Sequence, residues 1–249
     1  MRIMCYRCFW PQPLCWCSSL TPTRTRTKFV FLMHPKEWKQ EKAATGRLTH
    51  LCLEHSEIRC GIGFDNHPEV SDVINDPSNF PVLLYPGREA INLTAGDAAI
   101  ARFTETMGHR QLVVFLLDAT WALGRKMLRL SQNLQRLPRI MFTPTGPSRF
   151  VIKQQPHPGC LSTLEATHEL LLTLERARLD TYENSGQLLS VFDRMQRFQM
   201  ECAADPNRGG YRRSAYKAPS ARIPPRGHSG TRRTGVFQAP AVGSLDRGP

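Results

Sequence analysis

The chain has 249 residues, which is enough for one large domain with additions at its ends. Its 33 Lys and Arg outnumber its 21 Asp and Glu, and the net charge of +12 favours a polyanionic partner such as nucleic acid. No apolar run reaches the roughly 18–20 residues that a membrane-spanning helix needs, so we expect a cytoplasmic protein without membrane association.

Two closely spaced cysteine pairs lie in residues 1–20. Cys5 and Cys8 form a C-x2-C pair, and Cys15 and Cys17 form a tighter C-x-C pair. Four thiolates at this spacing can bind one tetrahedral Zn²⁺ ion as a closed structural site, and we favour this over free thiols in a basic arm. The other cysteines are scattered, and we expect each to be a small buried hydrophobic residue: Cys52, Cys60, Cys160 and Cys202.

Apolar runs and turn signals predict alternating strands and helices along residues 21–202. We expect strands over 28–34, 57–62, 81–85, 112–117, 139–142 and 149–153. We expect helices over about 39–53, 70–74, 122–130, 162–179 and 188–200. The strand at 112–117 is apolar throughout, which suits a parallel strand covered on both faces. The alternation indicates an α/β fold with a mainly parallel sheet.

The composition changes at residue 203. Residues 203–249 hold nine Lys and Arg, two acidic residues, many Gly and Pro, and few apolar residues. Such a segment cannot bury enough apolar surface to offset its ordering entropy, so we predict a basic disordered tail. The expected organisation is a cysteine module over 1–20, a main domain over 21–202 and this tail.

The clearest candidate site lies where the strand at 112–117 ends. Asp118 is followed by Thr120 and Trp121, and open α/β sheets bind ligands beyond the carboxyl ends of their strands. Asp is also a favoured N-cap residue, so spacing alone leaves two roles open: facing a ligand or capping the next helix. Arg125 and Lys126 on that helix would contact phosphate or form a solvated face.

Two further segments have the character of ligand loops. One is Leu84-Tyr85-Pro86-Gly87, which follows a predicted strand, and the other is Ser162-Thr163-Leu164-Glu165, which opens the strongest predicted helix. Free amides at a helix N-terminus suit a carboxylate or phosphate, although Ser162 and Glu165 also fit a capping box. The chain has no P-loop, G-x-G-x-x-G or G-x-S-x-G pattern, which argues against nucleotide hydrolases, dinucleotide oxidoreductases and serine hydrolases.

Taken in order, these segments resemble the DTW-domain family, the tRNA-uridine aminocarboxypropyltransferases. The resemblance covers roughly residues 5–200. The matching parts are Cys5-x2-Cys8 with Cys15-x-Cys17, Met33-His34-Pro35-Lys36-Glu37 with Thr45-Gly46-Arg47, Leu84-Tyr85-Pro86-Gly87, Leu117-Asp118-Ala119-Thr120-Trp121 with Arg125-Lys126, and Leu161-Ser162-Thr163-Leu164-Glu165-Ala166. The family signature reads Asp-Thr-Trp, whereas here Ala119 separates Asp118 from Thr120.

The resemblance implies a SPOUT-like α/β fold with a knotted cofactor site, and S-adenosylmethionine as co-substrate. The 3-amino-3-carboxypropyl group would move to N3 of a uridine in tRNA, and methylthioadenosine would be released. Asp118 would accept the N3 proton as catalytic base, or would hold the amino group of the cofactor. The implied partner is tRNA, with no obligate protein partner.

The resemblance also assigns binding residues. Those expected to bind the cofactor are Leu84, Tyr85, Pro86, Asp118, Thr120, Trp121, Ser162, Thr163 and Glu165. Those expected to contact tRNA phosphate, which positions RNA without reading its sequence, are Arg47, Arg125 and Lys126.

Two other functions fit parts of the pattern. A SPOUT-like RNA methyltransferase would release S-adenosylhomocysteine in place of methylthioadenosine. A non-catalytic, zinc-dependent RNA-binding protein would bind RNA in a salt-sensitive way, and Asp118→Ala would not change that binding.

Overall fold

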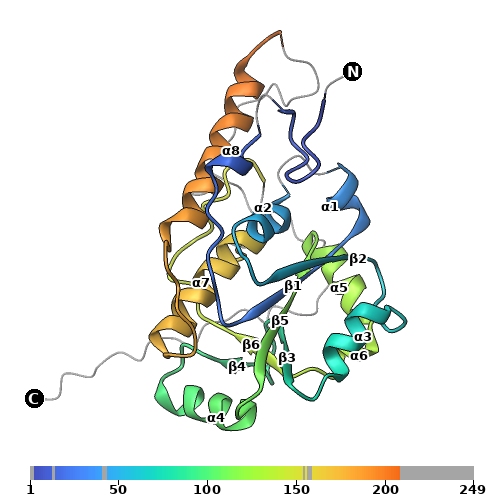
Figure 1. Ribbon diagram of the computed structural model, residues 1–249, viewed down its shortest axis with the longest axis vertical. Helices are drawn as coiled ribbons and strands as arrows, with labels where there is room; N and C mark the ends of the chain where they lie inside the picture. The colour runs from blue at the N-terminus through green and yellow to red at the C-terminus, as the bar shows by residue number, and fades with distance from the viewer. Residues whose placement is uncertain (1–2, 13–14, 41–43, 154, 156–158, 208–249) are drawn as a thin grey trace, which may run out of the picture.

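The computed structural model describes residues 3–12, 15–40, 44–153, 155 and 159–207 (Figure 1). Within these residues one sheet is formed by six strands: β1 (Lys28–Met33), β2 (Ser56–Cys60), β3 (Asn79–Leu84), β4 (Ile91–Asn92), β5 (Gln111–Asp118) and β6 (Arg139–Met141). The strand order is β2-β1-β5-β3-β6-β4, and every neighbouring pair is parallel. The predicted α/β class with a mainly parallel sheet is confirmed.

Helices cover both faces of this sheet. The described residues form α1 (Pro35–Gln40), α2 (Thr45–Leu51), α3 (Pro68–Asn75), α4 (Asp97–Met107), α5 (Trp121–Arg129), α6 (Gln132–Gln135), α7 (Thr163–Arg176) and α8 (Gly186–Ala204). Figure 1 shows α2, α7 and α8 on one side of the sheet and α3, α5 and α6 on the other. None of the described helices is both long and apolar enough to span a membrane.

Alternate residues of the central strands enter two separate cores. Phe29 and Phe31 of β1 join the core under α2, α7 and α8, whereas Val30 and Leu32 join the core under α3, α5 and α6. Successive side chains of a strand point to opposite faces, so a strand that is apolar throughout fits only a sheet covered on both sides. This arrangement explains the continuous apolar run that forms β5.

The two central strands, β1 and β5, bring together segments that are distant in sequence. In their parallel register, Met33 lies beside Asp118, and the backbone amide of His34 donates to the Asp118 carbonyl at 3.0 Å. The carboxyl ends of parallel strands share one edge of the sheet. Residues after β1, β3 and β5 therefore meet at the edge where Asp118 lies.

The cysteine module packs against the main core rather than standing apart from it. The ring of Trp10 lies 4.5 Å from that of Trp16 and 5.0 Å from that of Phe198 on α8. Cys8, Trp10 and Trp16 are buried members of the core under α2, α7 and α8. The first residues of the chain are thus held by its last described helix.

Some expected elements differ from the structure. No strand forms over 149–153, because the backbone amides of Arg149 and Phe150 are taken by the side chains of Glu165 and Ser148. The helix expected over 39–53 is wrong in extent, since α2 begins only at Thr45 and residues 41–43 lie outside the described chain. The helix α4 was not predicted, although Ile100, Phe103 and Met107 recur at helical spacing and pack on the core.

The tail and the scattered cysteines agree only in part with the expectations from the sequence. α8 continues to Ala204, past the expected start of the tail, and residues 208–249 of the predicted tail lie outside the described chain. Cys60 is exposed, contrary to expectation, whereas Cys52, Cys160 and Cys202 are buried as predicted. The knot stays a prediction, because the connection from β6 to α7 includes residues 154 and 156–158, which are not described.

Candidate active site

Asp118 lies buried at the carboxyl end of β5. Its Oδ1 accepts a hydrogen bond of 2.6 Å from the Thr163 hydroxyl at the start of α7. Its Oδ2 is buried and has no hydrogen-bond partner among the described residues. The N-cap of α5 is Thr120, whose side chain makes no capping bond, so the alternative that Asp118 caps this helix is wrong. The carboxylate points instead into the space between β5, α2 and α7.

Burial raises the pKa of Asp118 to about 6. The Thr163 hydrogen bond works against this rise, as do the positive charges of Lys153 and Arg47, while the negative charge of Glu37 adds to the rise. A carboxyl group with this pKa exchanges its proton near neutral pH, which is the property required of a general acid or base.

Gly46 allows α2 to approach the Asp118 carboxylate closely. A Cβ atom added to Gly46 would lie 2.3 Å from Asp118 Oδ2 and 2.5 Å from its Cγ. Real carbon atoms do not approach that closely, so any side chain at this position would displace the carboxylate. The glycine thus belongs to the site, whereas in the sequence it stands out only as part of the Thr45-Gly46-Arg47 segment that resembles the family.

Charged groups from the segment after β1 lie at the same edge. Glu37 of α1 is buried, and its Oε2 lies 3.4 Å from Lys153 Nζ. His34 is also buried, and burial lowers its pKa, so the neutral imidazole is favoured. Neither Glu37 nor Lys153 was predicted as a site residue. The available signal was that Glu37 follows a strand whose parallel neighbour ends at Asp118.

The start of α7 combines the two roles that its sequence left open. Ser162 accepts a hydrogen bond from the Glu165 amide, and the Glu165 side chain accepts one from the Ser162 amide, which confirms the capping box. The same carboxylate accepts from the Ser148 hydroxyl at 2.9 Å and the Arg149 amide at 2.6 Å. Glu165 therefore fixes the preceding loop, while Thr163 contacts Asp118 directly.

The remaining predicted cofactor residues border the same edge. Leu84 ends β3 and pairs with Ile140, and Tyr85 and Pro86 follow it, half-buried. Burial raises the pKa of Tyr85, while the nearby Arg125 and Arg139 lower it. Thr120 is exposed, and the partly buried Trp121 begins α5. Because β3 and β5 are neighbours, these segments flank the Asp118 carboxylate.

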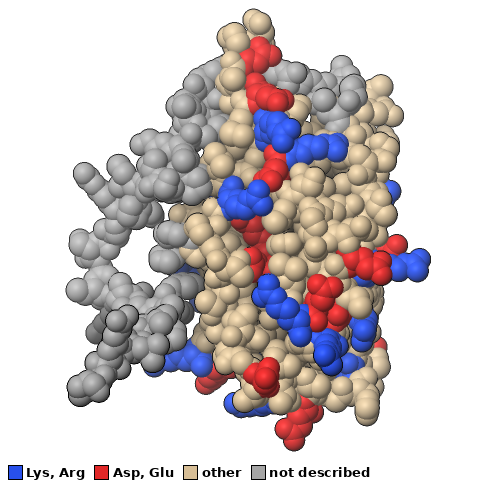
Figure 2. Space-filling view, turned by 90° about the vertical axis from the view of Figure 1, so that its left-hand side faces the viewer, with Lys and Arg blue, Asp and Glu red and all other residues tan. Residues whose placement is uncertain are grey.

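The three predicted phosphate contacts have different surroundings. Arg125 and Lys126 are exposed on α5 at this edge of the sheet. Arg47 is buried, and its guanidinium lies over the rings of Phe9 and Trp38 at 4.6 and 4.7 Å. On the face where α8 lies, Lys and Arg alternate with Asp and Glu and form no single basic patch (Figure 2). Contact with RNA stays a prediction for all three residues.

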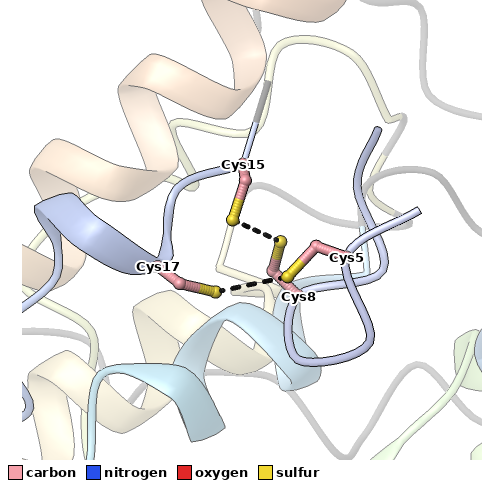
Figure 3. Close-up of side chains that lie close together, drawn as sticks. All are labelled: Cys5, Cys8, Cys15 and Cys17. Atoms are coloured by element: carbon pink, nitrogen blue, oxygen red, sulfur yellow. Dashed lines mark hydrogen bonds between the residues drawn. The ribbon is translucent and has the colours of Figure 1, made fainter. Parts of the chain in front are cut away.

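The four cysteines of the module converge on one point (Figure 3). All four sulfur atoms lie within 4.8 Å of one another. Cys5 Sγ lies 3.9 Å from Cys17 Sγ, and Cys8 Sγ lies 3.7 Å from Cys15 Sγ. Tetrahedral zinc with Zn–S bonds of about 2.3 Å separates its sulfur ligands by about 3.8 Å, so the donor set fits this ion. Backbone amides of Cys8 and Arg7 lower the pKa of Cys5 to about 6, which favours the thiolate that a metal needs, whereas burial raises the pKa of the Cys8 and Cys17 thiols.

The fold and site define an α/β protein with a buried carboxylate at the carboxyl edge of a parallel sheet and an attached cysteine cluster able to bind a metal ion. A family model for the DTW domain matches residues 2–200. The chain therefore belongs to the DTW-domain family.

Three relatives are named tRNA-uridine aminocarboxypropyltransferases. The Drosophila melanogaster protein of type 2 is 31% identical over 181 residues, which are 70% of this chain and 67% of the relative. The Mus musculus protein of type 2 is 29% identical over 180 residues, 70% of this chain and 57% of the relative. The Arabidopsis thaliana protein of type A is 25% identical over 223 residues, 80% of this chain and 81% of the relative. The chain thus spans little more than half of the mouse protein, and no solved structure matches it.

Proposed function

We propose that this protein transfers the 3-amino-3-carboxypropyl group of S-adenosylmethionine to N3 of a uridine in tRNA. The names of the relatives support the reaction and the substrate. The structural observation that carries the proposal is Asp118, a buried carboxyl group with a pKa of about 6 and one oxygen without a partner among the described residues. Such a group can take up the proton that N3 of uridine loses when it becomes alkylated.

The bonding changes balance without any further reactant. The N3–H bond of uridine breaks, and its proton passes to the Asp118 carboxylate. A bond forms between N3 and the carbon of the aminocarboxypropyl group that is attached to sulfur. The electron pair of the broken carbon–sulfur bond stays on sulfur as methylthioadenosine leaves. The sulfonium of S-adenosylmethionine supplies a leaving group that is already activated, so the protein contributes mainly orientation and proton acceptance.

The residues around Asp118 have separate tasks in this proposal. Thr163 holds Oδ1, which leaves Oδ2 to accept the proton. Tyr85, Thr120 and Trp121 line the cofactor site beside the carboxylate, together with Leu84, Pro86 and the start of α7. Arg125 on α5 is exposed at the same edge and contacts tRNA phosphate together with its neighbour Lys126. A cytoplasmic location is part of the same proposal.

The cysteine cluster has a structural part in the proposal. Cys5, Cys8, Cys15 and Cys17 hold one Zn²⁺ ion, and four protein ligands leave no position for a substrate on the metal. The ion fixes the turn that packs beside α1 and α2, and takes no part in the transfer.

The test is to incubate the purified protein with S-adenosylmethionine and tRNA that lacks uridine modifications, then identify nucleosides and small products by mass spectrometry. We expect aminocarboxypropyl-uridine and methylthioadenosine in equal amounts. The rate constant kcat/KM should rise with pH through about 6 and then level off, because only the ionised Asp118 accepts a proton.

Two variants sharpen this test. Asp118→Asn should lower kcat by a factor on the order of 100 or more, since an amide cannot act as a base. Asp97→Asn removes an exposed carboxylate on α4 and should match the unchanged protein. Methylated nucleoside with S-adenosylhomocysteine would establish the methyltransferase alternative instead. Tight, salt-sensitive RNA binding without any product would establish the non-catalytic one.

A further inference from the structure

Arg47 is held in an unusual setting for an arginine in a basic protein. Its guanidinium lies over the rings of Phe9 and Trp38, 4.6 and 4.7 Å from their centres, and the two rings contact each other edge to face with centres 5.2 Å apart. It donates a hydrogen bond of 2.7 Å to the Trp38 carbonyl, and its Nε is buried without a partner among the described residues. A cation packed over two aromatic rings is held in place and partly removed from water. Its charge therefore acts over a longer range than that of an exposed arginine.

Phe9 reaches Arg47 from the cysteine module through a strained turn. Its φ angle is 58°, in the left-handed region that bulky residues rarely adopt. The turn is closed by the Phe9 amide, which donates to the Cys5 carbonyl at 2.8 Å. Phe9 directly follows the metal ligand Cys8, so the fold of the cysteine turn determines where its ring lies. A strained residue that contacts the neighbourhood of a site is a reason to ask for a functional cause.

Arg47 is also next in sequence to a residue that packs against Asp118. Arg47 directly follows Gly46, the residue whose missing side chain leaves room for the Asp118 carboxylate. The positive charge of Arg47 lowers the pKa of Asp118, and the negative charge of Asp118 in turn raises that of Arg47 against the larger effect of burial. One short helix, α2, thus carries both the opening for the carboxylate and a charge that stabilises its ionised form.

We propose that Arg47 is a positioning residue for Asp118, and that the cysteine turn holds Arg47 in that position through the ring of Phe9. The cysteine cluster, the Phe9–Trp38 ring pair with Arg47, and the buried carboxylate then form one continuous support. Metal binding far from the reacting atoms would set the geometry and the protonation of the base. The catalytic part of this inference rests on the proposed transferase function, whereas the electrostatic part does not.

Two other charged groups and one hydroxyl face Asp118 and must be held constant in any test. They come from three other parts of the fold: Glu37 on α1, Thr163 on α7 and Lys153 after β6. Substitutions at Phe9 and Arg47 leave these three side chains unchanged.

The experiment measures the titration of Asp118 directly in the zinc-loaded protein. Aspartate labelled with ¹³C at the carboxyl group gives one NMR signal per residue, and Asp118→Asn identifies the signal by its absence. The variants are Arg47→Gln, Arg47→Lys and Phe9→Gly, each with its zinc content measured. Glycine suits a φ of 58°, so Phe9→Gly removes the ring without adding strain to the cysteine turn.

Arg110→Gln is the matched control. Arg110 also lies over an aromatic ring, 4.6 Å from the centre of Phe80, but at the start of β5, the opposite end of the strand from Asp118. It should leave the Asp118 titration, the zinc content and the turnover as they are.

We expect Arg47→Gln to move the Asp118 midpoint upward, because a positive charge that favours the ionised carboxylate is lost. Phe9→Gly should move it in the same direction by less, with one zinc ion still bound, because the guanidinium becomes hydrated and mobile. Arg47→Lys should keep most of the effect on the Asp118 midpoint but lose turnover, since an ammonium cannot stack on the two rings as the planar guanidinium does. Turnover at neutral pH should fall by about tenfold in Phe9→Gly.

Three results would overturn the inference. An Asp118 midpoint in Arg47→Gln equal to that of the unchanged protein would remove the electrostatic link. A Phe9→Gly protein with full zinc, an unchanged midpoint and unchanged turnover would remove the link to the cysteine turn. An equal shift in Arg110→Gln would show a general charge effect. If no transfer product forms with any protein, the proposed function fails, but the NMR titration still decides the electrostatic inference.

Discussion

Asp118 destabilises the folded chain when it is ionised. Its carboxylate is buried, one oxygen is satisfied by Thr163, and the other has no partner among the described residues. Burial without full hydrogen bonding favours the neutral form, which is why its pKa is raised to about 6 from an ordinary value of 3.8. The residue is better explained by chemistry than by stability, because an amide or a hydroxyl would fit the same place at lower cost.

The stability of Asp118→Asn should therefore depend on pH in a defined direction. The folded state holds the Asp118 proton more tightly than the unfolded state, so the contribution of this residue is lost as pH rises through about 6. At about pH 8 the variant should be more stable than the unchanged protein by up to about 3 kcal/mol, and below about pH 4 the two should match. Urea unfolding across this range measures the difference. A stability difference between the two proteins that is as large at about pH 4 as at about pH 8 would contradict the assigned pKa of Asp118.

The sequence identified the right turn but could not orient the residue within it. Asp118 and Thr163 were both singled out, yet the choice between capping and a ligand role depends on where one side chain points. That direction is set by Gly46, which lies 72 positions earlier in the chain and shows no periodic signal. Glu37 and Lys153 were missed for the same reason, since only strand order brings them to this edge.

At the level of elements, the site depends on how closely α2 approaches the end of β5. α2 is a short helix, and its N-cap residue makes no side-chain capping bond, so packing must hold it. Most of its residues are buried, and Leu48 and Leu51 join the core under α7 and α8. The position of the helix is thus set by apolar contacts, while Gly46 leaves the space that the carboxylate occupies.

Two glycines inside helices provide a matched pair of substitutions. Gly46→Ala should destabilise the protein by about 1–3 kcal/mol and abolish most activity, because its Cβ would overlap Asp118. Gly124→Ala on α5 should stabilise the protein by up to about 1 kcal/mol, since its Cβ would meet only Leu117 Cβ at 4.0 Å. Thermal unfolding and turnover of both variants test this. Similar effects at the two positions would show that helix propensity, and not overlap with the Asp118 carboxylate, causes the changes in stability and turnover.

The elements that sequence reasoning recovered are those with strong local patterns. The strands β1, β3 and β5 and the helix α7 carry continuous apolar runs or a complete capping box, and each was found. The residues over 149–153 are apolar enough for a strand, but Glu165 and Ser148 take two of their amides. Competition from side chains elsewhere in the chain leaves no trace in the local sequence.

On the scale of the whole molecule, the cysteine module is part of the core. Trp10 contacts both Trp16 and Phe198, and Arg194 of α8 lies 4.9 Å from the centre of the Trp16 ring. The Arg194 guanidinium also donates to the Ser19 hydroxyl at 2.7 Å. Loosening the cysteine turn would expose these aromatic rings, so its effect should extend well beyond the first residues.

Removal of the metal is therefore expected to weaken the entire fold. The protein should contain one zinc ion, and Cys8→Ser should lose most of it and unfold with several kcal/mol less stability, roughly the effect of losing a structural zinc ligand. Fluorescence of Trp10 and Trp16 should shift to longer wavelength as the rings meet water. Cys60→Ser, which alters an exposed thiol, is the control. A Cys8→Ser protein with normal zinc and normal melting would exclude a structural site.

The contact between the first residues and α8 has a consequence for synthesis. Trp16 is synthesised roughly 180 residues before Arg194 and Phe198. At ordinary bacterial or eukaryotic elongation rates the interval is on the order of ten to forty seconds. During that time the four thiols and two tryptophans have no α8 to pack against. A nascent chain that captures zinc early would keep these groups from oxidation and misassociation, so the supply of metal during translation would set how much of the protein reaches its native state.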